Sequence, residues 1–350
     1  MLDINISKLT DKFKSITNKK LQDLVSVDFD AAGVNCVRMR KTGDNVSVTA
    51  ADVLPAVDIG MDSARAVETG ASFSLPRNLI ARYVSICIPA DNAIVKLLNL
   101  PGGFNSDNEE QIRGLMGIEK ENRRIGYRMV NEGHGRSETK MLTVAIPEAQ
   151  AQAACAMFPY GVPAPMSMET AGLAVLTAFF YSTVQNNPDD AIGIIGCSAR
   201  NTFIAFFFKK ELALIRKFDF GTYHLLDTIQ QSLGVDRETA LDVMADNSFD
   251  ISQLIKEVSG PFIKQLVISK DFVERREDCH ILKVFVPGET RVSHDWLNEV
   301  KSALGVDVDF WNPLEGLTVA PNAFPKKYEN QLSRFSAAVG SGLGSFEENE

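Results

Sequence analysis

The sequence predicts an α/β fold built from two similar lobes, and two observations support this prediction. The chain has 350 residues, enough for roughly two domains of ~150 residues each. A succession of strand, small-residue turn, strand, charged turn and strand also occurs twice. It is LVSVDFDAAGVNCVRMRKTGDNVSV from residue 24 and AIGIIGCSARNTFIAFFFKKELALI from residue 191. Because helical segments follow both copies, the repeat indicates a duplicated α/β lobe.

Composition excludes several classes of function. Hydrophobic residues make up 45% of the chain and charged residues 23%, and the formal net charge is −9. These values are ordinary for a globular protein, and the acidic balance argues against a nucleic-acid partner. No apolar run reaches the ~18 residues of a membrane span, and no signal-peptide region is evident, so the chain is expected inside the cell. The 5 cysteines and 4 histidines show no metal-ligand spacing.

Residues 1–20 differ in character from the rest of the chain. Ile6, Leu9, Phe13 and Ile16 fall on one face of a predicted helix, and lysines occupy much of the remaining surface. A basic amphipathic helix can lie on an anionic membrane, so this segment is a candidate for peripheral membrane contact. The alternatives are a helix docked on its own domain and a frayed terminus.

The first half of the chain alternates short strands with helices. Alternating apolar residues between Gly, Asn and Asp turns predict strands at 24–28, 34–40, 46–54, 85–89, 93–100, 126–131 and 140–146. Helices are predicted at 76–82, where Pro76 suits a first helical turn, at 107–123, which is rich in Glu and Arg, and at 148–157 and 169–184. The stretch 158–165, rich in Pro and Gly, is predicted to be a loop.

The second half begins with the repeated strands and continues mainly as helices. The same criteria predict strands at 192–195, 201–208, 212–218 and 281–286. Helices are predicted at 222–233, 238–245, 251–277, 294–304 and 332–346, and the last of these contains three glycines. Two facing lobes would place the small-residue turns at 30–33 and 196–199 opposite each other, where backbone N–H groups can hold phosphates.

These residues resemble a known family. The paired turns resemble the two phosphate loops of the actin-like ATPase superfamily. Further landmarks resemble the PilM family of type IV pilus assembly proteins: LVSVD at 24–28, SICIP at 85–89, MSMETAGLA at 166–174 and WNPLEGL at 311–317. The resemblance covers roughly residues 22–346. It implies an α/β actin-like fold, with ribonuclease H-like duplicated lobes, four subdomains and a small subdomain inserted in the first lobe.

The resemblance also implies boundaries for these parts. After the N-terminal segment 1–20, the first large subdomain would comprise 21–83, 147–187 and 315–346. The inserted subdomain, similar to that of FtsA, would be 84–146. The second lobe, with a large and a small subdomain, would be 188–314.

Proteins of this family are cytoplasmic scaffolds, and the resemblance implies the same partners. It implies binding of the N-terminal cytoplasmic peptide of a PilN-like inner-membrane protein, contact with other pilus assembly proteins, and association with the inner membrane through these partners. The peptide would lie between the first large subdomain and the inserted one. Apolar residues of the insertion are the candidates for its groove: Val95, Leu97, Leu98, Ile112, Leu115 and Met116.

The resemblance further implies a nucleotide site between the lobes, with ATP and Mg²⁺ as possible cofactors and Asp28 as the Mg²⁺ ligand. Its candidate residues come from the two turns, from a later loop and from the last helix. They are Asp28, Asp30, Ala31, Ala32, Gly33, Asn35, Gly196, Cys197, Ser198, Gly288, Gly340 and Gly342.

Four positions depart from the pattern of that site. Asp30 stands where the family has glycine, Asn35 where it has a base, Ile194 where it has an acid, and Met244 where a lysine is frequent. Charged groups of this kind typically supply 10²–10⁴-fold in rate. We therefore expect a degenerate site with weak or absent ATPase activity. The alternatives are a functional actin-like ATPase and a GspL-like component of a type II secretion platform.

Overall fold

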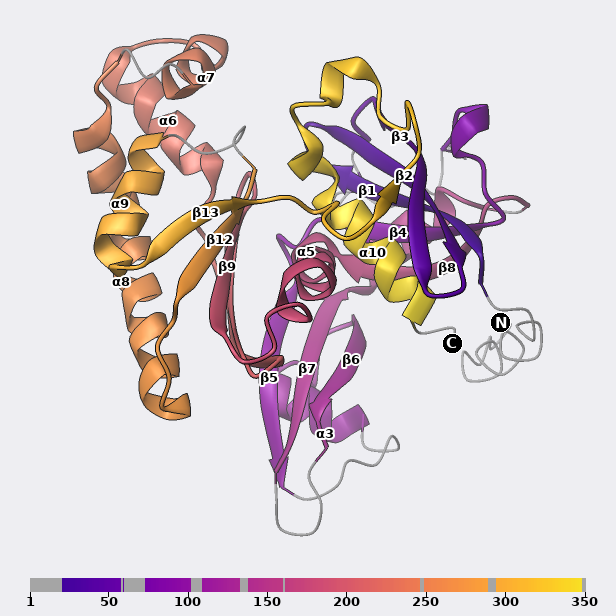
Figure 1. Cartoon of the computed structure of the whole chain (residues 1–350), viewed down its shortest axis with the longest axis horizontal. Helices are drawn as coiled ribbons and strands as arrows, with labels where there is room; N and C mark the ends of the chain where they lie inside the picture. Colours follow the sequence, from indigo (N-terminus) through magenta and orange to yellow (C-terminus); the bar gives the residue numbers. More distant parts are fainter. Residues whose placement is uncertain are drawn as a thin grey trace.

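The structure is a computed structural model of the whole chain (Figure 1). It describes residues 21–57, 59, 73–101, 109–132, 138–159, 161–245, 249–288 and 294–347. The predicted amphipathic segment 1–20 lies outside the described residues. Within them, no helix is both long and apolar enough to cross a membrane.

The first lobe is built on a six-stranded sheet in the order β14-β3-β2-β1-β4-β8. Its central strand β1 is antiparallel to β2 and parallel to β4. Residues 24–29 of β1 are all buried, as a strand covered on both faces requires. The strands are β1 (Asp23–Asp30), β2 (Gly33–Thr42), β3 (Asn45–Leu54), β4 (Tyr83–Ile88), β8 (Ala164–Thr170) and β14 (Thr318–Val319).

The second lobe contains a five-stranded sheet in the order β11-β10-β9-β12-β13. On one side of β9 lie β10 and β11, each antiparallel to the strand before it, and on the other side lie the parallel strands β12 and β13, as around β1 in the first lobe. The duplicated lobe predicted from the sequence repeat is therefore confirmed. The strands are β9 (Ala191–Cys197), β10 (Thr202–Phe208), β11 (Glu211–Phe218), β12 (Lys283–Pro287) and β13 (Asp307–Trp311).

Helices cover the sheets and join the lobes. The outer face of the second sheet packs against α6 (Thr222–Leu233), α7 (Arg237–Ala245), α8 (Ser252–Glu277) and α9 (His294–Leu304). Its inner face packs against α5 (Ala171–Phe179), which continues as a π-helical turn over 180–184. The ring of Phe179 contacts the rings of Phe207, Phe285 and Trp311, so one apolar core joins α5 to the second sheet.

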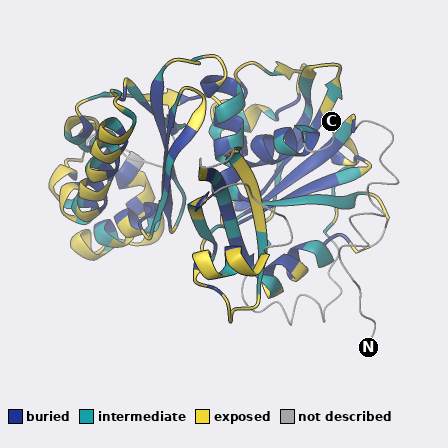
Figure 2. Ribbon diagram, turned by 90° about the horizontal axis from the view of Figure 1, so that it is seen from below, coloured by how far each residue is buried: buried dark blue, intermediate teal, exposed yellow. Residues whose placement is uncertain are grey.

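The last helix, α10 (Ser336–Glu347), lies across one face of the first sheet and alongside α5. It follows two short 3₁₀ turns, η3 (Lys326–Tyr328) and η4 (Leu332–Phe335). Another such turn, η1 (Arg77–Leu79), precedes β4, and α4 (Glu148–Ala156) packs on the opposite face of the sheet from α10. Figure 2 shows that the strands of both lobes are largely buried, whereas the outer helices each expose one face.

The inserted subdomain is a three-stranded sheet in the order β5-β7-β6, covered on one face by a helix. Its elements are β5 (Ile94–Pro101), α3 (Glu109–Met116), β6 (Arg123–Asn131) and β7 (Glu138–Pro147). Ile112 and Met116 of α3 pack on Leu100 and Met141 of the sheet. The opposite face of the sheet is turned toward α5 and the second lobe (Figure 1).

The structure corrects three boundaries. Strand β4 lies in the large sheet between β1 and β8, so the insertion begins after Ile88 and not at residue 84. Residues 164–170 form strand β8, because pairing with β4 outweighs their weak local signal, and the helix predicted from Glu169 begins at Ala171. The helix predicted over 107–123 ends at Met116, because Gly117 has a φ of 75° that stops it.

Candidate functional site

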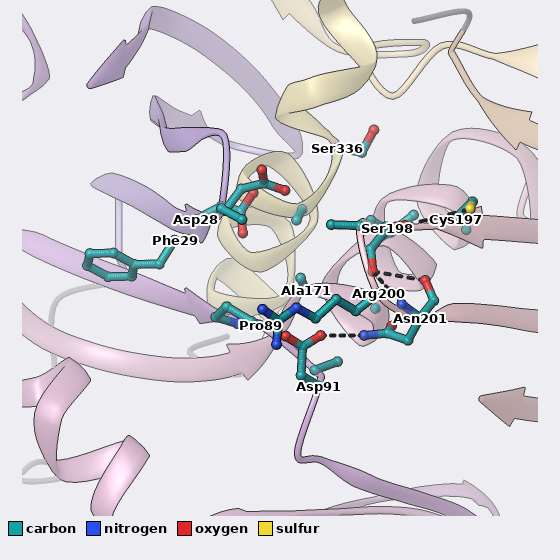
Figure 3. A pocket seen from close by; sticks show the side chains of 18 of the residues that line it. Asp28, Phe29, Pro89, Asp91, Ala171, Cys197, Ser198, Arg200, Asn201 and Ser336 are labelled. Atoms are coloured by element: carbon teal, nitrogen blue, oxygen red, sulfur yellow. Dashed lines mark hydrogen bonds between the residues drawn. The ribbon is translucent and has the colours of Figure 1, made fainter. Parts of the chain in front are cut away.

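A cleft of about 590 Å³ lies between the lobes, where the sequence predicts the nucleotide site (Figure 3). It is lined by the ends of β1 and β9, the start of α5, and the residues that join η4 to α10. The linker from β4 to β5 forms another wall, with Pro89 and Asp91. Its volume is in the range of small-molecule and cofactor sites.

In the first loop, a hydrogen-bonded chain connects Asp28, Asn35 and Arg334. Asp28 is 4% exposed, and Nδ2 of Asn35 donates to its Oδ2 over 3.0 Å. Nε of Arg334 donates to Oδ1 of Asn35 over 3.0 Å. A guanidinium from η4 therefore lies beside the uncharged residue that replaces the expected base. Arg334 lies 299 positions from Asn35, so its only signal in the sequence is an arginine just before the small-residue helix.

The rest of the first loop is a tight turn. Asp30 and Ala31 line the cleft together with Asp28, whereas Ala32, Gly33 and Asn35 do not. Oδ1 of Asp30 accepts a hydrogen bond from the backbone N–H of Ala32 over 2.8 Å. Gly33 has a φ of 142°, and a Cβ there would lie 2.9 Å from Cγ1 of Val53. The turn conformation and the close contact with β3 therefore explain why residue 33 is a glycine.

The second loop contributes Gly196, Cys197 and Ser198 to the cleft wall. A Cβ on Gly196 would lie 2.2 Å from the ring of Phe203, which pairs with it across β9 and β10. This glycine therefore makes room for an aromatic ring. Ile194 is 1% exposed and belongs to the core shared with α5, so an apolar residue suits its position.

The carbonyl groups of the second loop occupy the N-terminus of α6. The backbone N–H of Thr222 donates to the carbonyl of Ser198 over 3.0 Å, and that of Tyr223 donates to the carbonyl of Ala199 over 2.9 Å. The loop itself is closed by Ser198, whose hydroxyl donates to the carbonyl of Asn201 over 2.8 Å. The backbone N–H groups of Thr222 and Tyr223 are therefore already hydrogen-bonded to the protein's own carbonyls.

The remaining predicted nucleotide residues lie outside the cleft wall. Gly288 has a φ of 50°, and a Cβ there would lie 1.9 Å from Oγ of Ser333, so η4 covers this glycine. Met244 is 7% exposed in the helical core of the second lobe. Neither residue lines the cleft.

Gly340 and Gly342 serve the packing of α10. A Cβ on Gly340 would lie 1.7 Å from the carbonyl oxygen of Ala174, so this glycine allows α10 to approach α5 closely. A Cβ on Gly342 would lie 2.4 Å from Sδ of Met39, on the sheet side of the helix. Their small size is accounted for by helix packing.

Two side chains of the second lobe hold the linker that leads into the insertion. Nδ2 of Asn201 donates to Oδ1 of Asp91 over 2.6 Å (Figure 3). Nζ of Lys217 donates to the carbonyls of Ala90, Asp91 and Ala93 over 2.8, 2.7 and 3.1 Å. Burial lowers the pKa of Lys217, and the nearby carboxylates of Asp219 and Asp91 act in the opposite direction. The lobes are thus bridged directly by protein groups.

The charged residues that line the cleft are divided unequally between its two walls. Its acidic lining residues, Asp28, Asp30 and Asp91, precede the second lobe in the chain. Among the described lining residues of the second lobe the charged one is Arg200, which extends across the cleft (Figure 3). Mg²⁺ is usually held by carboxylates, and this wall offers none. The cleft does present Oε1 of Gln150, a buried acceptor without a partner among the described residues.

A groove of about 420 Å³ lies between the inserted subdomain and the first lobe. It is lined by β6 and β7, the end of β8, α5 with the turn that follows it, α10, and the adjoining ends of β10 and β11. Much of its wall is apolar, with Leu142, Val144, Leu173, Leu176 and Phe180. A cavity of this composition suits a peptide with apolar side chains.

Hydroxyl groups form the polar part of this groove. Ser167 lies 2.6 Å from Ser345 and 2.7 Å from Ser85 between Oγ atoms, and Ser85 lies 2.5 Å from Ser341. Ser167 and Ser345 place this buried network at the groove wall. The hydroxyl of Tyr181, also in the wall, is buried and has no partner among the described residues. An unmatched buried hydroxyl is costly unless a ligand completes it.

Two polar contacts connect the insertion to its neighbours beside the groove. Nη2 of Arg128 on β6 lies 2.7 Å from Oε2 of Glu347 on α10. Nδ2 of Asn131 donates to Oε1 of Glu211, in the second lobe, over 3.3 Å. The groove is therefore framed by contacts to both lobes.

None of the six residues predicted for a peptide groove lines this cavity. Ile112 and Met116 are buried under α3, and Leu115 is 45% exposed on that helix. Val95, Leu97 and Leu98 line a third cavity of about 420 Å³, between β5 and β11 of the second lobe. The apolar spacing of α3 thus serves the core of the insertion. The residues that line the groove come from strands of all three sheets and from α5 and α10, so no local periodicity groups them.

Comparisons with known proteins were made on both sequence and structure. No protein-family model matches the sequence, and no curated protein matches it significantly. Among solved structures, the chain is similar to one described as "PilM-PilN type IV pilus biogenesis complex". The TM-score is 0.76 and the identity 16%, over 94% of this chain and 99% of that chain.

Two further solved structures are more distant. One is a Bacteroides thetaiotaomicron protein with an actin-like ATPase fold, with a TM-score of 0.48 and 13% identity over 89% of this chain and 95% of that one. The other is the ethanolamine utilization protein EutJ from Carboxydothermus hydrogenoformans, with a TM-score of 0.45 and 15% identity over 97% and 99%. Only the first likeness has a TM-score above 0.5 among these three. The chain has the actin-like fold of PilM over nearly its whole length.

Proposed function

We propose that this chain is a PilM-like scaffold of a type IV pilus assembly complex. Its groove between the insertion and the first lobe binds the N-terminal cytoplasmic peptide of a PilN-like inner-membrane protein. The observation that carries the proposal is this groove, with apolar walls and the unpartnered hydroxyl of Tyr181, at the junction that the resemblance implies. The likeness to the solved PilM-PilN complex supports it. In this proposal the protein works in the cytoplasm and is held at the inner membrane by its partner.

The proposal includes a nucleotide cleft with weak or absent binding and no efficient hydrolysis. The second-lobe wall offers Arg200 but no carboxylate, and the glycine of its loop is covered by Phe203. The bridges from Lys217 and Asn201 hold the linker against the second lobe without a ligand. The cleft then contributes to the rigidity of the scaffold rather than to turnover.

A binding measurement tests the peptide proposal. The probe is a synthetic peptide of the first ~15 residues of the PilN-like protein encoded beside this chain, long enough to cross the groove as an extended segment. Wild-type protein should bind it, and Leu142→Arg, which places a charge in the apolar wall, should weaken binding about tenfold or more. Leu115→Arg is the matched control, because Leu115 lies in the same subdomain but is 45% exposed. Failure of the wild type to bind, or equal binding by both variants, contradicts the proposal.

A further inference from the structure

The third cavity, between the insertion and the second lobe, has a charge opposite to that of the whole chain. The chain has 36 basic and 45 acidic residues, yet no carboxylate among the described residues lines this cavity of about 420 Å³. Its charged lining residues are all cations: Lys96, Arg216, Lys217 and Arg276. A concave surface lined by one sign of charge attracts ligands of the opposite sign.

Three of these cations are held in place by neutral groups. Nζ of Lys96 donates to the carbonyl of Met116, at the end of α3, over 3.0 Å. Nη1 of Arg216 donates to the hydroxyl of Ser269 on α8 over 3.0 Å. Nζ of Lys217 holds the carbonyls of the linker between β4 and β5. Carbonyl and hydroxyl acceptors carry no net charge, so they position these side chains without neutralising them.

Carboxylates lie near two of the cations but outside the cavity wall. Nε of Arg276 is 3.5 Å from Oε1 of Glu277, and the side chain of Arg276 is 43% exposed. The carboxylates of Asp219 and Asp91 oppose the lowering of the pKa of Lys217 by burial. Because an exposed ion pair contributes little free energy, the guanidinium of Arg276 can exchange Glu277 for a carboxylate of a ligand at small cost.

The rest of the wall is largely apolar and follows two strands. It is lined by residues 95–99 of β5 and 213–218 of β11, which are outer strands of their sheets. Leu214 and Arg216 are two residues apart on β11, so they share the face that the bond to Ser269 turns toward α8. The exposed ring of Phe272 on α8 is a further part of the wall. Five residues of extended chain span about 17 Å, so the stretch 95–99 accommodates a segment of about this length.

We propose that this cavity binds an acidic, extended segment of a partner protein. Carboxylates of the segment pair with Arg216 and Arg276. Its alternate side chains are apolar and pack on Leu214 and Phe272. A hollow between two strands admits a single chain but not the plane of a bilayer, which favours a peptide over an anionic membrane. The cavity shares no lining residue with the groove between the insertion and the first lobe, so this second docking surface does not depend on the function proposed above.

A designed peptide tests the proposal. The probe has about eight residues, enough to cross the cavity in extended form, with Glu alternating with Leu and a fluorescein label. Its binding to the full chain is followed by fluorescence anisotropy. The same peptide with Gln in place of Glu should bind about tenfold more weakly, and added salt should reduce this difference because it screens exposed charges. Absence of binding by the Glu peptide, or equal binding by the two peptides, overturns the proposal.

Charge reversal in α8 locates the site. Arg276→Glu should weaken binding of the Glu peptide about tenfold or more, because it replaces an attraction in the cavity wall by a repulsion. Arg275→Glu is the matched control, since Arg275 is the adjacent exposed residue of the same helix and does not line the cavity. Both variants change the net charge equally. Equal losses would therefore indicate attraction by the surface as a whole and would overturn the assignment to this cavity.

The apolar part of the site has its own pair of variants. Phe272→Ser should weaken binding of the Glu peptide about fivefold, because it removes apolar surface that the bound segment covers. Ile268→Ser is the control, since Ile268 is exposed one turn earlier on α8 and does not line the cavity. If Phe272→Ser binds the peptide as the wild type does, the alternation of acidic and apolar side chains in the ligand is wrong.

Two further probes separate other anions from an acidic peptide. They are phosphatidylcholine vesicles that contain phosphatidylserine, and a single-stranded oligothymidylate. Neither should show binding that Arg276→Glu weakens more than Arg275→Glu. If one of them does, and the Glu peptide does not compete with it, the cavity serves a membrane or a nucleic acid and the proposal is overturned.

Discussion

Asn35 receives a hydrogen bond from Nε of Arg334 over 3.0 Å, although the two residues are 299 positions apart. The same Asn35 donates to Asp28 over 3.0 Å. A neutral side chain thus connects a cation and an anion at the base of the cleft. Asn35 stands where the family pattern has a basic residue, and in the fold the guanidinium of Arg334 lies beside it.

Removal of Arg334 should destabilise the protein. Asn35 is 1% exposed, so Arg334→Ala leaves a buried acceptor without this donor, at a cost of about 1–3 kcal/mol in the free energy of unfolding. Arg200→Ala is the control, because Arg200 is exposed in the same cleft and should change the free energy by about 0.5 kcal/mol or less. Urea denaturation measures both. Equal effects of the two variants would show that the contact to Asn35 contributes no stability.

Gly196 should resist even the smallest substitution. Gly196→Ala would place a Cβ 2.2 Å from the ring of Phe203 and should cost about 1–3 kcal/mol. Phe203→Leu should reduce this cost in the double mutant. Gly260→Ala in α8 is the control, since nothing lies within 4 Å of its Cβ position and alanine favours a helix. Thermal unfolding of the four variants gives the coupling, and additive effects would contradict the contact.

The linker between β4 and β5 should loosen without Lys217. Lys217→Met removes three hydrogen bonds to the carbonyls of residues 90, 91 and 93, so amides of this linker should exchange faster with solvent. Lys283→Met is the control, because Lys283 pairs with Asp309 at the surface. Hydrogen exchange followed by mass spectrometry reports both. If the exchange of the linker amides is the same in Lys217→Met as in the wild type, the hydrogen bond from Asn201 is enough to hold the linker.

Stability should respond to alkaline pH through Lys217. Burial lowers its pKa in the folded state below the ordinary value of 10.5. At pH values between the lowered pKa of the folded state and 10.5, the unfolded chain binds more protons than the folded chain. The free energy of unfolding therefore rises with pH in this range. The difference in stability between wild type and Lys217→Met should therefore move in favour of the wild type as pH approaches 10.5. Urea titrations at several pH values measure this difference, and a constant difference would contradict the shift.

ATP with Mg²⁺ should not be turned over. The second-lobe wall of the cleft has no carboxylate among its described residues, so steady phosphate release should stay at the level of buffer alone. A coupled phosphate assay with purified protein tests this. Arg334→Ala, purified in the same way, is the control for phosphate release by a contaminating enzyme. Steady phosphate release by the wild type that is absent in Arg334→Ala would contradict this prediction and support a functional actin-like ATPase.

Much of the architecture follows from the sequence. The repeat at residues 24 and 191 predicts two lobes, because each copy alternates apolar residues between polar turns. The long helix predicted over 251–277 is observed as α8, because apolar residues at helical spacing identify a long helix reliably. These features depend on neighbours within a few residues of each other, and the sequence displays them directly.

Other features depend on contacts between distant segments. Strand β8 exists because β4 pairs with it, whereas the sequence predicts a loop up to residue 165 and a helix from Glu169. Arg334 reaches Asn35, and Ser333 covers Gly288, because η4 lies at the cleft between the two lobes. The groove combines β6, β8, α5 and α10, whose residues have no common periodicity. The sequence by itself determined the duplicated lobes, whereas tertiary packing decided which residues line the cleft and the groove, because those surfaces form only when separate elements meet.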